Sequence, residues 1–118
     1  PTNREYYLSN YKGEYMRDKF IDAIHSRSKI MLTFYSKEDN ATITRLTAPM
    51  DFGPSRRAHD KSDRFHFWDY ESDKKNHVLS LRPEAIKSLV VIAQNFHPQE
   101  FVNWTPNWFI PRDWDQYS

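Results

Sequence analysis

The sequence predicts an α+β domain in which an N-terminal helix is followed by five short strands and then by an aromatic C-terminal arm. One early segment repeats apolar residues at helical spacing, and several later segments alternate apolar and polar residues as strands do. Polar turns join adjacent strands, so we expect the sheet to bend strongly into a small, nearly closed β-barrel that the helix caps. We place this domain at residues 13–96, after a polar segment 1–12 and before the arm 97–118.

The helix is predicted over about residues 13–27. Its apolar residues recur at three- and four-residue steps, while charged residues occupy the positions between them. We expect Met16, Phe20 and Ile24 to form the face that packs on the sheet.

A hairpin is predicted over residues 29–48. Ile30, Leu32 and Phe34 occupy alternate positions, which is the period of a strand with one buried face. A polar turn and a second, β-branched strand follow, and Pro49 ends the hairpin. The next segment, 50–63, has neither period and is predicted to be a long loop.

A second hairpin is predicted from residues 64–70 and 77–81, which a polar turn separates. Phe65 and Phe67 belong to its buried face. The outward face of the same strand carries Arg64, His66, Trp68 and Tyr70. After a proline, the nearly continuous apolar run 86–93 predicts a last strand that is buried on both faces.

Composition limits the function classes. A chain of 118 residues fits one domain. Seventeen basic and sixteen acidic residues give a net charge of +1, so any nucleic-acid binding must use a local patch. The absence of cysteine excludes disulfides, thiolate metal sites and cysteine nucleophiles. We see no membrane-spanning run and no signal-peptide core, and therefore expect a cytoplasmic protein with no membrane partner.

The arm differs in composition from the rest of the chain. Residues 97–118 hold three prolines and six large aromatic residues without a clear period. Ordering about twenty residues costs on the order of 30 kcal/mol, while each buried Trp returns about 4–6 kcal/mol. Docking therefore needs nearly all the rings. We favour an arm packed on its own domain; exchange into a partner and disorder are the alternatives.

Residues 20–93 also carry a family resemblance. The helix end 20–24 with the strand after it, Arg45 four residues before Pro49, the strand 64–70 and the run 79–86 follow one another in the order found in the WYL domain. The chain resembles this family of Sm-like or SH3-like β-barrels, which occurs mostly in prokaryotic transcriptional regulators. Two differences stand out: Phe65, His66 and Phe67 replace the three naming residues, and Ser80 stands where the family has an Arg.

The resemblance implies a regulatory sensing module. Such a module binds a nucleotide-like ligand or single-stranded nucleic acid and is often part of a dimeric regulator. The fold that it implies is the same bent barrel that the alternating segments predict.

The predicted binding site is a basic patch on the loop and the third strand. Guanidinium groups hold phosphate while an exposed ring stacks a base, the combination that single-stranded nucleic acid requires. The residues assigned to this patch are Arg45, Arg56, Arg57, Arg64, His66, Trp68 and Tyr70. Three alternatives stay open: a solvated loop whose aspartates cancel the charge, Arg45 paired with a carboxylate, and Trp68 and Tyr70 covered by the arm.

No catalytic motif is present. The five histidines form no known ligand motif, two glycines cannot build a phosphate-cradling loop, and a nuclease made from His59, Asp60 and Asp63 needs geometry that sequence does not show. We therefore expect no enzyme, no metal site and no cofactor. The leading hypothesis is a module that binds single-stranded nucleic acid or a nucleotide. The alternative is a protein-interaction or homodimerisation module whose arm anchors are Trp104, Trp108 and Trp114.

Overall fold

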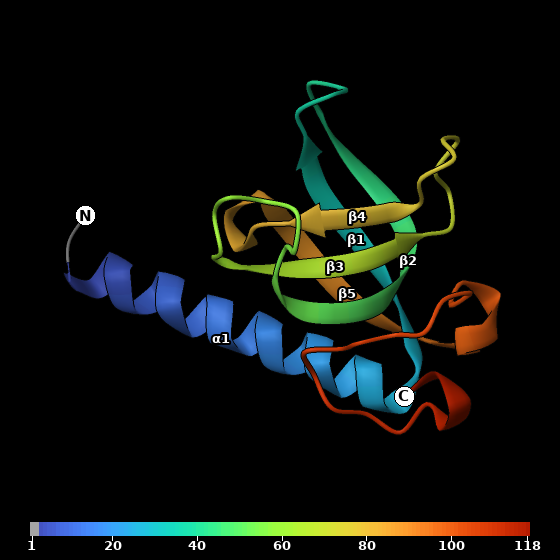
Figure 1. Cartoon of the computed structure of the whole chain (residues 1–118). Helices are drawn as coiled ribbons and strands as arrows, with labels where there is room; N and C mark the ends of the chain where they lie inside the picture. The colour runs from blue at the N-terminus through green and yellow to red at the C-terminus, as the bar shows by residue number, and fades with distance from the viewer. Residues whose placement is uncertain (1–2) are drawn as a thin grey trace.

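In the described part of the chain, one α-helix and a five-stranded antiparallel sheet form the domain, which confirms the α+β class (Figure 1). The computed structural model describes the backbone of residues 3–118 and the side chains of residues 12–118. In chain order the elements are α1 (Asn3–Ser26), β1 (Ser28–Ser36), β2 (Ala41–Pro54), β3 (Asp63–Asp69), β4 (Val78–Leu81) and β5 (Ile86–Asn95). Their order across the sheet is β4-β3-β2-β1-β5.

The long strand β2 joins two halves of a strongly bent sheet. Its first half pairs with β1 and its second half with β3. As a result β3 and β4 lie across β1 and β5 in Figure 1. β4 and β5 are the two edges of the hydrogen-bonded order and do not pair with each other. The sheet is therefore open, and the predicted closure into a barrel is not confirmed.

The core lies between α1 and the concave side of the sheet. Phe20 and Ile24 of the helix are completely buried. The Phe20 ring contacts the rings of Phe65 and Phe67, each with centroids 5.1 Å apart. Met16 packs against the same cluster. These contacts confirm the predicted helix face and the predicted buried face of β3.

Two predicted element limits are wrong. α1 begins at Asn3 rather than near residue 13, and Figure 1 shows its N-terminal part extending beyond the sheet. Segment 3–12 lacks an apolar period, yet helix propagates cheaply from a turn that is already packed. β2 does not end at Pro49 but continues to Pro54, which shortens the predicted loop 50–63. Pairing with β1 stops at Thr47, and a bulge follows Pro49. The lack of a backbone N–H at Pro49 therefore removes few hydrogen bonds between strands.

The prediction of a fully buried last strand is also wrong. β5 pairs only with β1 and is an edge of the sheet. Ile86 and Leu89 are buried, whereas most of the other residues of β5 are exposed, and Val90 is 49% exposed. An apolar run favours strand structure through its β-branched residues, but it does not specify how many of its faces are covered.

The arm packs on its own domain. Phe101 and Val102 are buried, and Trp114 is completely buried. The Trp114 indole Nε1 donates to the carbonyl oxygen of Ile24 at 2.8 Å, which satisfies a carbonyl at the C-terminal end of α1. Two 3₁₀ turns, Pro98–Glu100 and Asp115–Tyr117, are the only regular structure of the arm. Across the described residues, α1 included, we find no helix that could cross a membrane.

Candidate functional site

The arm and the second half of the sheet enclose a groove of about 680 Å³. We call it the arm groove. It combines three parts: the end of β2 with the first residues of the following loop, the outward face of β3 and β4, and the middle of the arm. Its lining residues are Met50, Asp51, Pro54, Ser55, Arg56, Arg57, His66, Asn76, Val78, Ser80, Trp104, Thr105, Asn107, Trp108 and Phe109.

The loop after β2 places two arginines in the groove. Arg56 donates to the carbonyl oxygen of Asn107 at 2.5 Å, and its guanidinium lies 4.3 Å from the centroid of the Phe109 ring. Lys61 donates to the carbonyl oxygens of Ser55 and Arg56, which holds the loop close to the end of β2. Arg57 is exposed, and its side chain makes no hydrogen bond or ion pair with any described residue.

Two tryptophans of the arm line the same groove. Trp104 is 43% exposed and contacts Trp108 edge to face, with centroids 6.0 Å apart. Trp108 donates from Nε1 to the carbonyl oxygen of Tyr117 at 2.8 Å and stacks on the guanidinium of Arg112 at 4.1 Å. These contacts fix the position of Trp108, whereas Trp104 keeps an accessible ring surface.

A buried ion pair fixes the arm beside β2. The Asp51 carboxylate accepts from the backbone N–H groups of Phe109 and Ile110 at 2.9 and 3.0 Å, and it pairs with the Arg112 guanidinium at 3.1 Å. The Arg112 side chain is 0% exposed and also donates to the carbonyl oxygen of Met50. Burial lowers the pKa of Arg112 to about 10, while the charge of Asp51 and its hydrogen bond work in the opposite direction. Asp51 is thus neutralised by its own partners, and the open part of the groove carries positive charge.

The outward face of β3 and β4 forms the floor of the groove. His66 and Ser80 are opposite each other in the strand register, and the His66 Nδ1 lies 2.7 Å from the Ser80 Oγ. The second ring nitrogen, Nε2, lies 2.9 Å from the carbonyl oxygen of Gly53.

The structure brings together some residues of the predicted patch and separates others. Arg56, Arg57 and His66 line the groove, and so do Trp104 and Trp108, which sequence reasoning assigned to a different hypothesis. Trp114 instead joins the core. The sequence carries no signal for Ser80 as a site residue, because only the register of β3 and β4 places it opposite His66.

The remaining residues of the patch lie elsewhere. Arg45 donates to the carbonyl oxygen of Glu71 at 2.6 Å, and Arg64 approaches Asp60 at 4.0 Å with its side chain 19% exposed. Trp68 stacks between His77 and Phe101, with centroid separations of 4.8 and 5.6 Å.

Tyr70 is held by the arm rather than by the groove. Its hydroxyl donates to Glu100 at 3.0 Å, and the Lys29 ammonium lies 4.7 Å from the ring centroid. Burial, the hydrogen bond to Glu100 and the charge of Glu100 all raise the pKa of Tyr70. This contact and the stacking of Trp68 on Phe101 agree with the alternative in which the arm covers both rings.

Comparison of the chain with protein-family models, with curated protein sequences and with solved structures finds no match in any of the three. The choice between sites therefore depends on geometry and charge.

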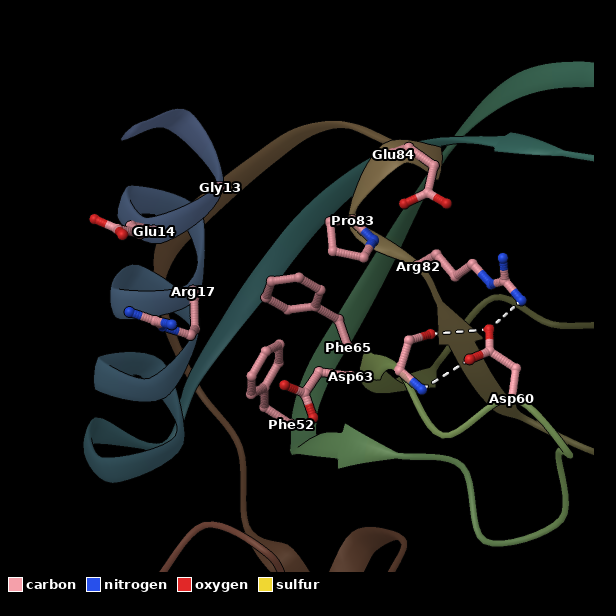
Figure 2. A pocket seen from close by; sticks show the side chains of 11 residues that line it. Gly13, Glu14, Arg17, Phe52, Asp60, Asp63, Phe65, Arg82, Pro83 and Glu84 are labelled. Atoms are coloured by element: carbon pink, nitrogen blue, oxygen red, sulfur yellow. Dashed lines mark hydrogen bonds and ion pairs between the residues drawn. The ribbon is translucent and has the colours of Figure 1, made fainter. Parts of the chain in front are cut away.

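A second hollow, of about 600 Å³, lies between α1 and the start of β3. Figure 2 shows the rings of Phe52 and Phe65 at its centre and Arg82 paired with Asp60 at its rim. The lining holds four carboxylates, those of Glu14, Asp60, Asp63 and Glu84, against two guanidiniums, those of Arg17 and Arg82. The hydrogen bonds from Ser62 and the nearby charges of Arg82 and Arg64 lower the pKa of Asp60. Carboxylates thus outnumber guanidiniums in this hollow, whereas the arm groove is lined by Arg56, Arg57 and a single carboxylate, that of Asp51.

Proposed function

We propose that the arm groove binds a ligand that carries both a base and a phosphate, namely single-stranded nucleic acid or a nucleotide. The observation that carries this proposal is that one groove holds the exposed indole of Trp104, from the arm, and the guanidinium of Arg57, from the loop, with which no described side chain or backbone group pairs. Base stacking on an aromatic ring together with cationic contacts to phosphate is the usual basis of such binding.

Charge supports the same ligand class. Asp51 lines the groove, but its oxygens already accept from three backbone N–H groups and from Arg112. Arg56 and Arg57 therefore set the sign of the potential that an incoming ligand meets. The sequence resemblance to the WYL domain, with its barrel-like sheet and its nucleotide-like ligands, favours the same interpretation.

The interaction hypothesis loses part of its basis in this arrangement. Of its three anchors, Trp114 is completely buried and Trp108 is held between Trp104 and Arg112. Interface hot spots need accessible aromatic anchors. Trp104 alone of the three keeps a large exposed surface, and it lines the same groove as Arg56 and Arg57.

Fluorescence anisotropy of a labelled oligothymidylate tests the proposal at two salt concentrations. Stacking on an aromatic ring contributes about 1–3 kcal/mol per base, so Trp104→Ala should weaken binding by about 5- to 150-fold. Arg57→Gln should weaken binding and reduce the slope of log K against log salt by about 1. Lys87→Gln is the matched control, because Lys87 is an exposed cation on β5, away from the groove.

Competition separates the two forms of the ligand. Displacement of the label by a mononucleotide, but not by inorganic phosphate, assigns the site to a single nucleotide. Displacement only by a longer strand assigns it to nucleic acid. The proposal would be overturned if the wild-type protein bound neither the oligonucleotide nor the mononucleotide.

A further inference from the structure

His66 and Ser80 form a hydrogen-bonded pair on the floor of the arm groove. They belong to neighbouring strands and are opposite each other in the register of β3 and β4. The distance from the His66 Nδ1 to the Ser80 Oγ is 2.7 Å, and both residues line the groove. A hydroxyl within hydrogen-bond reach of an imidazole is the first requirement of an activated serine nucleophile.

The partners of the imidazole fix its tautomer. The Gly53 carbonyl oxygen can only accept a hydrogen bond, and it lies 2.9 Å from the Nε2 of His66. In the neutral ring Nε2 therefore carries the proton, and Nδ1 presents its lone pair to the Ser80 hydroxyl. The imidazole is thus oriented by a third group, as the base in a catalytic triad is oriented.

The register also places the backbone N–H of Ser80. Asp69 donates from its backbone N–H to the carbonyl oxygen of His77 at 2.8 Å, which marks a hydrogen-bonded pair between the strands. Antiparallel pairs alternate, so Leu79 is in the next such pair, and Ser80 directs its N–H toward the open edge of the sheet. An N–H group of the nucleophile itself is one of the donors that stabilise an oxyanion in serine hydrolases.

We propose that Ser80 is a nucleophile activated by His66, and that the arm groove hydrolyses carboxylic esters. The Ser80 Oγ forms a bond to the ester carbonyl carbon as its proton passes to the His66 Nδ1. The bond from that carbon to the alcohol oxygen then breaks, and the alcohol leaves with the proton from Nδ1. Water attacks the acyl group in the same way, which releases the acid and restores the Ser80 hydroxyl. The exposed ring of Trp104 offers an apolar contact for an aryl or alkyl part of the ester.

This activity goes beyond ligand binding, because its reacting groups, His66 and Ser80, differ from the proposed base and phosphate contacts, and only Trp104 is shared. His66 and Ser80 are fourteen residues apart in the chain and form no known sequence motif. The metal-ligand, phosphate-cradling and nuclease motifs, whose absence from the sequence predicts no enzyme, do not contain this pair.

Covalent labelling of the intact chain tests the proposal. The probes are p-nitrophenyl acetate and a fluorophosphonate, and the readout is the mass of the chain followed by peptide mapping of the adduct. We expect one adduct per chain on Ser80 and none in Ser80→Ala. General-base catalysis contributes at least about 100-fold, so His66→Gln should slow adduct formation by about that factor. His77→Gln is the matched control, because His77 bonds to the Asp69 carbonyl oxygen outside the groove.

Mapping of the wild-type adduct needs no variant, so a variant that fails to fold does not weaken the test. An adduct confined to lysines or to other histidines, or a wild-type rate equal to that of Ser80→Ala, would overturn the proposal. Oligonucleotide binding by wild type without a Ser80 adduct rejects the activity alone. A Ser80 adduct without binding of any nucleotide rejects the binding function alone.

Discussion

The ion pair between Asp51 and Arg112 should control whether the arm stays on the domain, and Asp51→Ala is the perturbation that tests this. Asp51 accepts from the backbone N–H groups of Phe109 and Ile110 as well as from the guanidinium. Its removal leaves those two donors unpaired. It also leaves a buried cation without its counter-ion, because the Arg112 side chain is 0% exposed.

The cost follows from this burial. Removing one member of a buried ion pair costs about 3–5 kcal/mol, because the remaining charge stays desolvated. For a domain of this length, about 4 °C of melting temperature corresponds to 1 kcal/mol, so we expect a decrease of about 10–20 °C. The exposed pair between Arg17 and Asp18 gives the control, since the Asp18 side chain is 68% exposed and Asp18→Ala should change stability by less than about 0.5 kcal/mol.

Urea denaturation followed by tryptophan fluorescence measures the effect, because Trp108 and Trp114 both contact Arg112. Arg112→Met and the double variant complete a mutant cycle. The two residues are in direct contact, so their coupling should be about 1–3 kcal/mol and the double variant should lose less than the sum of the single losses. A loss below about 1 kcal/mol for Asp51→Ala, or strict additivity, would refute the reasoning.

Two further predictions concern single residues. Gly53→Ala should destabilise the domain by about 1–3 kcal/mol, because the added Cβ would lie 2.6 Å from the Cδ2 of Phe109 and the residue has φ +156°. Gly13→Ala in α1 should instead stabilise the domain by about 0.5–1 kcal/mol, because nothing lies within 4 Å of the added Cβ. If urea denaturation gave changes in unfolding free energy of the same sign for the two alanine variants, it would contradict this prediction. The raised pKa of Tyr70 means that the native phenol keeps its proton at a pH where the unfolded chain, with a pKa of 10.0, releases it. The contribution of Tyr70 to the free energy of unfolding is therefore fully present below pH 10.0 and is lost as pH rises above it. Tyr70→Phe should reduce this loss of stability at high pH. Parallel stability curves for the two proteins between about pH 9 and about pH 11 would contradict the prediction.

The buried faces of the elements could be predicted from the sequence because their spacing follows directly from backbone geometry. Phe20 and Ile24 repeat at the helical step, and Phe65 and Phe67 repeat at the strand step, and all four are buried. The limits of elements were less predictable. β2 passes through Pro49 because β1 no longer pairs there, and this depends on which strands are neighbours rather than on local propensity.

The site was only partly predictable for the same reason. Arg56 and Arg57 are evident as a basic pair in the sequence, but Trp104, which lines the same groove, is about fifty residues away along the chain. Only the path of the arm across the end of β2 brings them into one groove. Conversely, Trp68 has the sequence features of an exposed stacking ring, but His77 and Phe101 stack on it in the folded domain. Alternation along a strand predicts which face a ring is on but not what covers it.

The geometry of the arm groove depends on the interior of the domain more than on its loops. Asp51 belongs to β2, and its carboxylate fixes the backbone at Phe109 and Ile110 directly. The Phe109 ring in turn contacts Gly53 and the guanidinium of Arg56, so one strand end holds both the arm and the loop. The carbonyl oxygen of the same Gly53 orients His66. A displacement of the arm should therefore alter the base contact, the phosphate contact and the imidazole together, because residues 51–53 of β2 position all three.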